Sequence, residues 1–163
     1  MAINPGRWTA TPVPTDEPVT VFLIGMRVNR WWKPWQWSRT GMAMGRMLTH
    51  LAKNPESGLL SFHSWFGRTT MLLSYWQSQE HLVRFARDPD LAHLPAWRTF
   101  NKAVGGGGDV GVWHETYQIK PSPHEVVYVN MPAFGLGRAL GVEQLGTGTS
   151  TATQRWKRAA AAE

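Results

Sequence analysis

The segment from Leu59 to Trp76, LLSFHSWFGRTTMLLSYW, decides the fold. It contains two runs of aliphatic and aromatic residues, 59–66 and 69–76, each of strand length. Gly67 and Arg68 separate the two runs and are typical of a tight turn. The segment therefore predicts a β-hairpin.

Strand and helix patterns flank this hairpin on both sides. Before it, 19–28 is a nearly continuous apolar run of strand length, and 38–53 carries apolar residues at helical spacing. After it, we expect a helix at 79–87, a second helical piece at about 94–104, a strand at 110–119 and a short strand at 125–130. The order predicts an α+β fold, the ferredoxin-like βαββαβ arrangement with an extra C-terminal strand.

In this arrangement the helices cover one face of an antiparallel sheet, and the other face needs cover. A second copy packing sheet to sheet would supply it, so we expect a homodimer of the dimeric α+β barrel kind. The barrel domain is expected at 19–131, after an extended N-terminal arm at 1–18. Residues 132–163 are expected to be a C-terminal loop and a mobile basic tail, because 146–153 is a low-complexity stretch.

Composition excludes several classes of site. The chain has no cysteine, which rules out disulfides, thiolate metal sites and a thiolate nucleophile. The net charge is +6, but the basic residues are scattered apart from 155–158, so we expect no nucleic-acid partner. No window approaches the length of a membrane span, and the N-terminus carries no signal-peptide pattern. We therefore expect a soluble, cytoplasmic protein with no membrane partner.

His114 is the first candidate for chemistry. On the strand 110–119, alternation places His114 on the same face as Val110 and Val112, which we expect to lie beneath the helices. Burial there would lower the pKa of the imidazole and leave it neutral, able to exchange a proton near pH 7. The alternative is a core histidine bonded to a backbone carbonyl.

His93 is the second candidate, just ahead of the helical piece at 94–104. It could direct a ring nitrogen into a cavity between helices and sheet, or it could be a helix N-terminal residue that faces water. A metal held directly by side chains is weakly supported, because no histidine pair has helical ligand spacing. For the other histidines, we expect surface positions at His50 and His81, an undecided position at His63 and a loop at His124.

Four motifs resemble the fumagillin-type monooxygenase family, which is related to the antibiotic-biosynthesis monooxygenases of dimeric α+β barrel fold. They are SWFGRTTMLLSYW at 64–76, EHL at 80–82, HLPAW at 93–97 and WHETY at 113–117. The resemblance implies an oxygenase of secondary metabolism that acts on a small organic substrate between sheet and helices.

A more distant resemblance concerns the C-terminal half of the haem-containing aldoxime dehydratases. It rests on EHLVRFA at 80–86, on His93 with the leucine after it, and on His114 with the glutamate after it. It implies that His93 is the axial ligand of haem b and that His114 is a distal acid–base catalyst. Those enzymes also use a distal arginine and a distal serine, for which the nearby candidates here are Arg68, Ser74 and Ser64. Aromatic side chains would line the haem slot, and the candidates are Trp76, Phe85, Trp97 and Phe100.

Four functional readings stay open on these grounds. The first is a small haem-binding monooxygenase-like enzyme, and the second is a cofactor-independent monooxygenase of the same fold. In the second, a base such as His114 deprotonates the substrate, and the carbanion reacts directly with oxygen. The third is a haem-dependent dehydratase acting on a C=N–OH or N–O substrate, and the fourth is a non-catalytic ligand-binding or stress-response module.

Overall fold

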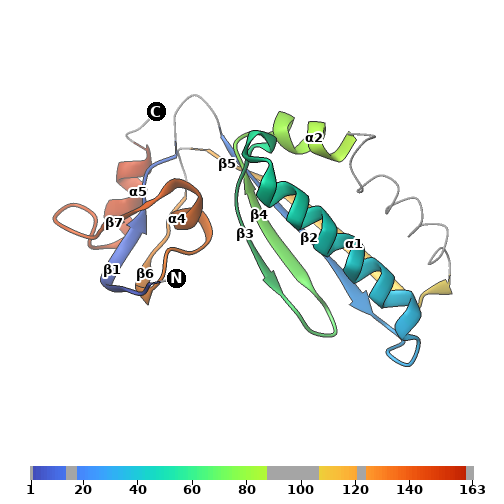
Figure 1. Cartoon of the computed structure of the whole chain (residues 1–163). Helices are drawn as coiled ribbons and strands as arrows, with labels where there is room; N and C mark the ends of the chain where they lie inside the picture. Colours follow the sequence, from blue (N-terminus) through green and yellow to red (C-terminus); the bar gives the residue numbers. More distant parts are fainter. Residues whose placement is uncertain (1, 14–17, 88–106, 121–123, 161–163) are drawn as a thin grey trace.

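The computed structural model describes residues 2–13, 18–87, 107–120 and 124–160 (Figure 1). The strands are β1 (Asn4–Ala10), β2 (Val19–Val28), β3 (Leu59–Trp65), β4 (Met71–Trp76), β5 (Val110–Ile119), β6 (Tyr128–Met131) and β7 (Val142–Gln144). The helices are α1 (Pro34–Lys53), α2 (Gln79–Arg87), α4 (Gly135–Leu140) and α5 (Ala152–Ala160), with a 3-10 turn at Pro55–Ser57. None of the helices within these ranges has both the length and the apolarity needed to cross a bilayer.

The main sheet has four antiparallel strands in the order β3-β4-β2-β5. The predicted hairpin is present as β3 and β4, and β2 and β5 have the predicted bounds. β2 and β5 pair along their whole length, from Val19 opposite Ile119 to Val28 opposite Val110. The α+β ferredoxin-like prediction is confirmed, while the helical piece expected at 94–104 lies outside the described residues.

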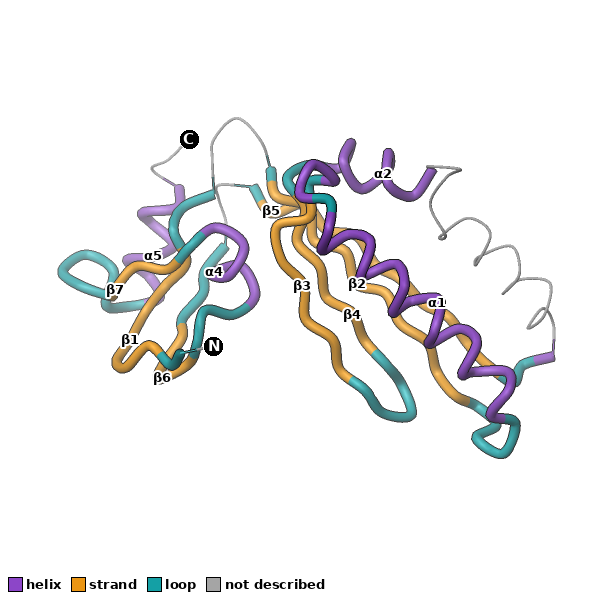
Figure 2. Tube along the Cα trace, viewed as in Figure 1, coloured by secondary structure: helices purple, strands orange, loops and turns teal. Residues whose placement is uncertain are grey.

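One face of the main sheet is covered by α1 and α2, and a hydrophobic core fills the space between (Figure 2). Burial of apolar area is the main favourable term that holds such layers together. Ser78 caps α2 as its residue type suggests, accepting a hydrogen bond from the backbone N–H of His81. The core is formed by Met47 and Leu51 of α1, Leu72 and Trp76 of β4, and Leu82 and Phe85 of α2, with flanking side chains from β2 and β3.

A second sheet, β6-β1-β7, lies on the other side of the main sheet together with α4 and α5 (Figure 1). The bounds predicted for an extended arm at 1–18 and for a loop and tail at 132–163 stay predictions, but the described part of the first segment contains β1, and that of the second contains α4, β7 and α5. The N-terminal segment contains β1, which pairs with β6 on one side and β7 on the other. The strand expected at 125–130 is β6, and it belongs to this second sheet.

Ion pairs connect α5, within the segment predicted to be a tail, to the second sheet and the residues next to it. The low-complexity composition of the preceding stretch gives no sign of these contacts. Arg155 of α5 is 9% exposed and forms an ion pair with Glu125, donating from Nε to Oε1 over 2.6 Å. Arg158 forms a further ion pair with Glu143 of β7. These contacts fix α5 against the second sheet.

The second sheet covers part of the face that we expected a partner subunit to cover. Ala10 of β1 and Leu136 of α4 share a hydrophobic core with Val21 of β2 and Tyr75 of β4. Leu23 and Leu73 on the same face pack against this core. The chain thus supplies some of the missing layer itself, and the dimer stays a prediction.

Candidate functional site

His114 lies on β5, the edge strand of the main sheet, opposite Ile24 of β2. Its ring centroid is 5.9 Å from that of Phe22, with the two planes tilted by 44°. Phe22 and Ile24 pack against the core beneath α1 and α2, so His114 is on the helix-facing side of the sheet, as alternation predicts.

The predicted burial of His114 is wrong, because the side chain is exposed. The cause is its position at the sheet edge. β2, β3 and β4 contribute side chains to the core beneath α1 and α2. Among the described residues, β5 contributes none. The imidazole is therefore accessible to a molecule that approaches along this edge.

The other site residues predicted for this region lie in sequence between α2 and β5. His93, Trp97 and Phe100 all fall within residues 88–106, outside the described residues. Their assignment as axial ligand and as walls of a cofactor slot stays a prediction.

Ser74 lies on the same face as His114 but is fully engaged in the core. Its Oγ donates a hydrogen bond to the carbonyl of Phe22 over 3.0 Å and accepts one from Nε1 of Trp76, also over 3.0 Å. Ser74 is 2% exposed. Both hydrogen bonds are internal to the sheet, so the geometry gives Ser74 a structural task. Ser64, the other serine candidate, is partly buried on β3.

Trp76 and Phe85 fill the core between β4 and α2. They are 2% and 8% exposed, and their ring centroids lie 5.3 Å apart. Walls of a haem slot would have to border a flat space, whereas these two rings pack against each other. The described part of the predicted haem site therefore does not fit a macrocycle in this arrangement.

Arg68 lies away from His114. It is exposed in the turn between β3 and β4, where its Nε donates to the carbonyl of Val28 over 3.3 Å. Val28 is four residues beyond Ile24, the partner of His114, which corresponds to about 13 Å along a strand. The structure does not bring Arg68 together with His114.

His63, which the sequence left undecided, lies on the opposite face of the sheet. Its Nε2 accepts a hydrogen bond from the backbone N–H of Gly135 over 3.2 Å, and its ring centroid is 4.1 Å from that of Phe134. Burial, and then the charge of Arg138, lower the pKa of His63. Alternation alone could not find this contact, because its partner segment was expected to be a loop.

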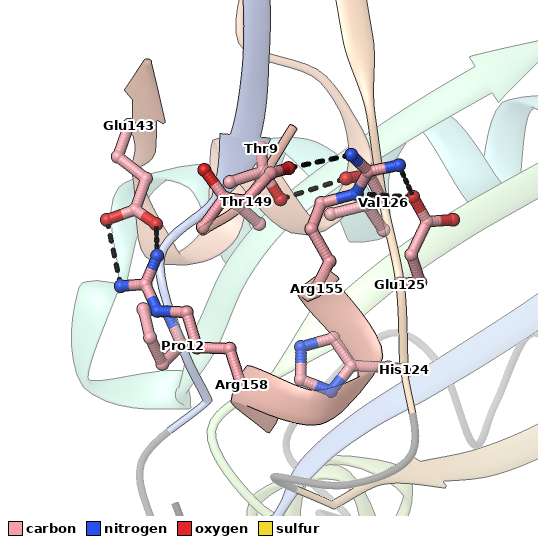
Figure 3. Close-up of a pocket in the computed structure, with 10 residues that line it drawn as sticks. Thr9, Pro12, His124, Glu125, Val126, Glu143, Thr149, Arg155 and Arg158 are labelled. Atoms are coloured by element: carbon pink, nitrogen blue, oxygen red, sulfur yellow. Dashed lines mark hydrogen bonds and ion pairs between the residues drawn. The ribbon is translucent and has the colours of Figure 1, made fainter. Parts of the chain in front are cut away.

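A small hollow lies beside the second sheet, and its lining includes Thr9, His124, Thr149 and the two ion pairs of α5 (Figure 3). Its volume is about 40 Å³. This is room for about three water molecules and not for an organic substrate. Its arginines already bind Glu125 and Glu143. Across the described ranges, no three histidine or carboxylate side chains gather as a metal site would require.

Known proteins show which family this chain resembles. Residues 19–136 match the family model described as Monooxygenase af470-like. Monooxygenase af470 of Aspergillus fumigatus is 28% identical over 134 residues, covering 77% of this chain and 47% of the relative. The chain thus spans about half the length of that curated relative.

Among solved structures, two aldoxime dehydratases share the fold. One, in complex with butyraldoxime, is 14% identical and covers 86% of this chain and 44% of its own, with a TM-score of 0.62. The other is 16% identical and covers 85% of this chain and 45% of its own, also with a TM-score of 0.62. Together with the family model, these findings confirm the resemblances read from the motifs. The chain belongs to the Monooxygenase af470-like family.

Proposed function

We propose that this chain is a monooxygenase-like oxidoreductase that acts on a small organic substrate of secondary metabolism, with His114 as the group that moves a proton. The observation that carries the proposal is the accessible imidazole of His114 on the helix-facing side of β5. Family membership supports the reaction class. We further propose that the protein works as a cytoplasmic homodimer, as expected for a dimeric α+β barrel.

The surroundings of His114 suit a base that serves an apolar substrate. Phe22 and Ile24 offer an aromatic and an aliphatic surface beside the imidazole. A substrate whose acidic CH₂ group lies against that surface would lose a proton to the imidazole of His114. The carbanion would then add to O₂, and the peroxide would take up the proton and lose water. The CH₂ group becomes a carbonyl, and the substrate itself supplies the electrons that reduce oxygen.

This cofactor-independent form is the one that the described residues support best. A haem-dependent form rests on the resemblance to aldoxime dehydratases and on His93, whereas Trp76 and Phe85 pack as core and not as walls. If haem b is bound, His93 is the residue that would hold its iron. The absorption spectrum of the protein as isolated separates the two forms, since a Soret band that disappears in His93→Ala would establish the haem form.

Oxygen uptake tests the role of His114. With an aromatic ketone that carries an acidic CH₂ group as substrate, we expect His114→Ala to lose at least about 100-fold in turnover, as expected for removal of a general base. His50→Ala is the matched control, because His50 is an exposed histidine on α1 and its removal leaves β5 untouched. Equal turnover in His114→Ala would refute the proposed role. Saturable binding with no turnover in the unmodified protein would instead favour a ligand-binding module, and turnover of an aldoxime would favour the dehydratase.

A further inference from the structure

One end of the main sheet carries exposed aromatic side chains on two adjacent turns. The turn between β2 and α1 presents Trp31 and Trp32, which are 73% and 57% exposed, and the first turn of α1 adds Trp35 at 61%. The turn between β3 and β4 presents Phe66, which is 89% exposed. A group of large apolar side chains that are this exposed is typical of an interaction site.

Backbone hydrogen bonds hold the turn between β3 and β4 to the end of β2, from which the other turn continues. The N–H of Val28 donates to the carbonyl of Arg68 over 2.8 Å, and the N–H of Thr70 donates to the carbonyl of Met26, also over 2.8 Å. Figure 2 shows both turns at the same end of the sheet, away from the second sheet. We call this end, with Trp31, Trp32, Trp35 and Phe66, the aromatic end.

Basic side chains surround the aromatic end. Arg27, Arg30 and Arg68 are exposed, and Lys33 is partly exposed. Asp109, which directly precedes β5, is the acidic side chain among the described residues of these turns and the start of β5. It binds Arg30 over 2.6 Å and Lys33 over 2.8 Å, and the hydrogen bond from Lys33 holds its pKa below the ordinary value. Four cations thus face one carboxylate, and the excess charge at this end is positive.

We propose that the aromatic end docks the protein onto the surface of an anionic lipid bilayer. Indoles favour the headgroup level of a membrane, and Arg and Lys attract anionic headgroups. Exposed turns with apolar tips and a basic rim can enter the interface without a span, so the absence of a spanning helix among the described residues does not oppose this mode. The proposed docking differs from the sequence-based expectation of no membrane partner, because that expectation rested on the lack of a spanning segment.

Sedimentation with lipid vesicles tests the proposal. We expect the full chain to sediment with vesicles of phosphatidylcholine containing about 30 mol% phosphatidylglycerol, and to be released when salt rises to about 0.5 M. Vesicles of phosphatidylcholine alone should bind far less. The variant Trp31→Ser/Trp32→Ser/Phe66→Ser should lose at least about tenfold in partition, because the buried apolar area is removed.

Trp156→Ser is the matched control, since Trp156 is 49% exposed on α5 and belongs to the second sheet's side of the molecule. It should bind vesicles like the unmodified chain, and circular dichroism should show both variants folded. Vesicle binding that is absent, or equal in all three proteins, would overturn the proposal. A triple variant with half the mass of the unmodified protein in sedimentation velocity would also overturn it, because the aromatic end would then be an interface between copies of the chain.

Discussion

The hydrogen bond between Trp76 and Ser74 predicts that Ser74 acts on stability and not on catalysis. Ser74→Ala removes the acceptor of the indole N–H while Trp76 stays 2% exposed and has no access to water. A buried donor left without a partner costs about 1–3 kcal/mol. For a chain of this size we therefore expect the melting temperature to fall by roughly 2–12 °C.

A double-mutant cycle isolates this cause. Trp76→Phe removes the indole N–H and keeps an aromatic ring near Phe85, so Ser74→Ala should cost less in that background than alone. We expect a coupling free energy of about 1 kcal/mol between the two positions, measured by urea unfolding.

Two results would refute the reasoning. In the first, Ser74→Ala costs the same free energy in both backgrounds, which would mean that the indole hydrogen bond carries no weight. In the second, Ser74→Ala leaves the unfolding free energy unchanged and abolishes oxygen uptake, which would make Ser74 a catalytic residue after all.

Three further predictions follow from packing and charge. Because the pKa of His63 is lowered by folding, protonation favours the unfolded chain, and stability should fall as pH drops below 6.5, the ordinary value. Urea midpoints at pH 7.5 and 5.5 test this, and a His63→Gln variant that keeps the same pH dependence would contradict it. Gly25→Ala should prevent folding of the sheet around β2, since a Cβ atom there would overlap the carbonyl oxygen of Thr70, and a normal circular dichroism spectrum and melting temperature would count against the close approach. Glu125→Ala should lower the unfolding free energy by about 1–3 kcal/mol, because it leaves the guanidinium of Arg155, which is 9% exposed, without its carboxylate. Glu143→Ala removes a more exposed ion pair and should cost less free energy in the same denaturation assay.

The main sheet could be predicted because its signals are local. The runs at 19–28 and 110–119 give β2 and β5 their bounds directly, and the turn at Gly67 and Arg68 gives the hairpin. The prediction of which face carries His114 rests on strand alternation alone.

The second sheet could not be predicted, because its determinants are distant in sequence or resemble loop composition. β1 contains Pro5 and Gly6, which read as breakers, and its partners lie more than a hundred residues away. α4 contains Gly135 and Gly137, and the close contact of Gly137 with Tyr128 and Val142 is a tertiary feature.

For the candidate site, the sequence could not predict which elements pack over each residue and bury it. Alternation placed His114 on the helix side but could not reveal that α1 and α2 leave the edge strand out of their core. The aromatic composition around Trp76 and Phe85 is equally compatible with a cofactor wall and with a packed core, and only the ring contact distinguishes them.

The position of β1 between β6 and β7 sets the order of events during synthesis. Asn4 pairs with Met131, and Ala10 pairs with Val142, so β1 leaves the ribosome more than a hundred residues before either of its neighbours is available. Closing so long a loop is slow compared with local pairing. The four-stranded sheet can therefore assemble first, while β1 stays an unpaired strand that is exposed to mispairing until β6 and β7 have been synthesised.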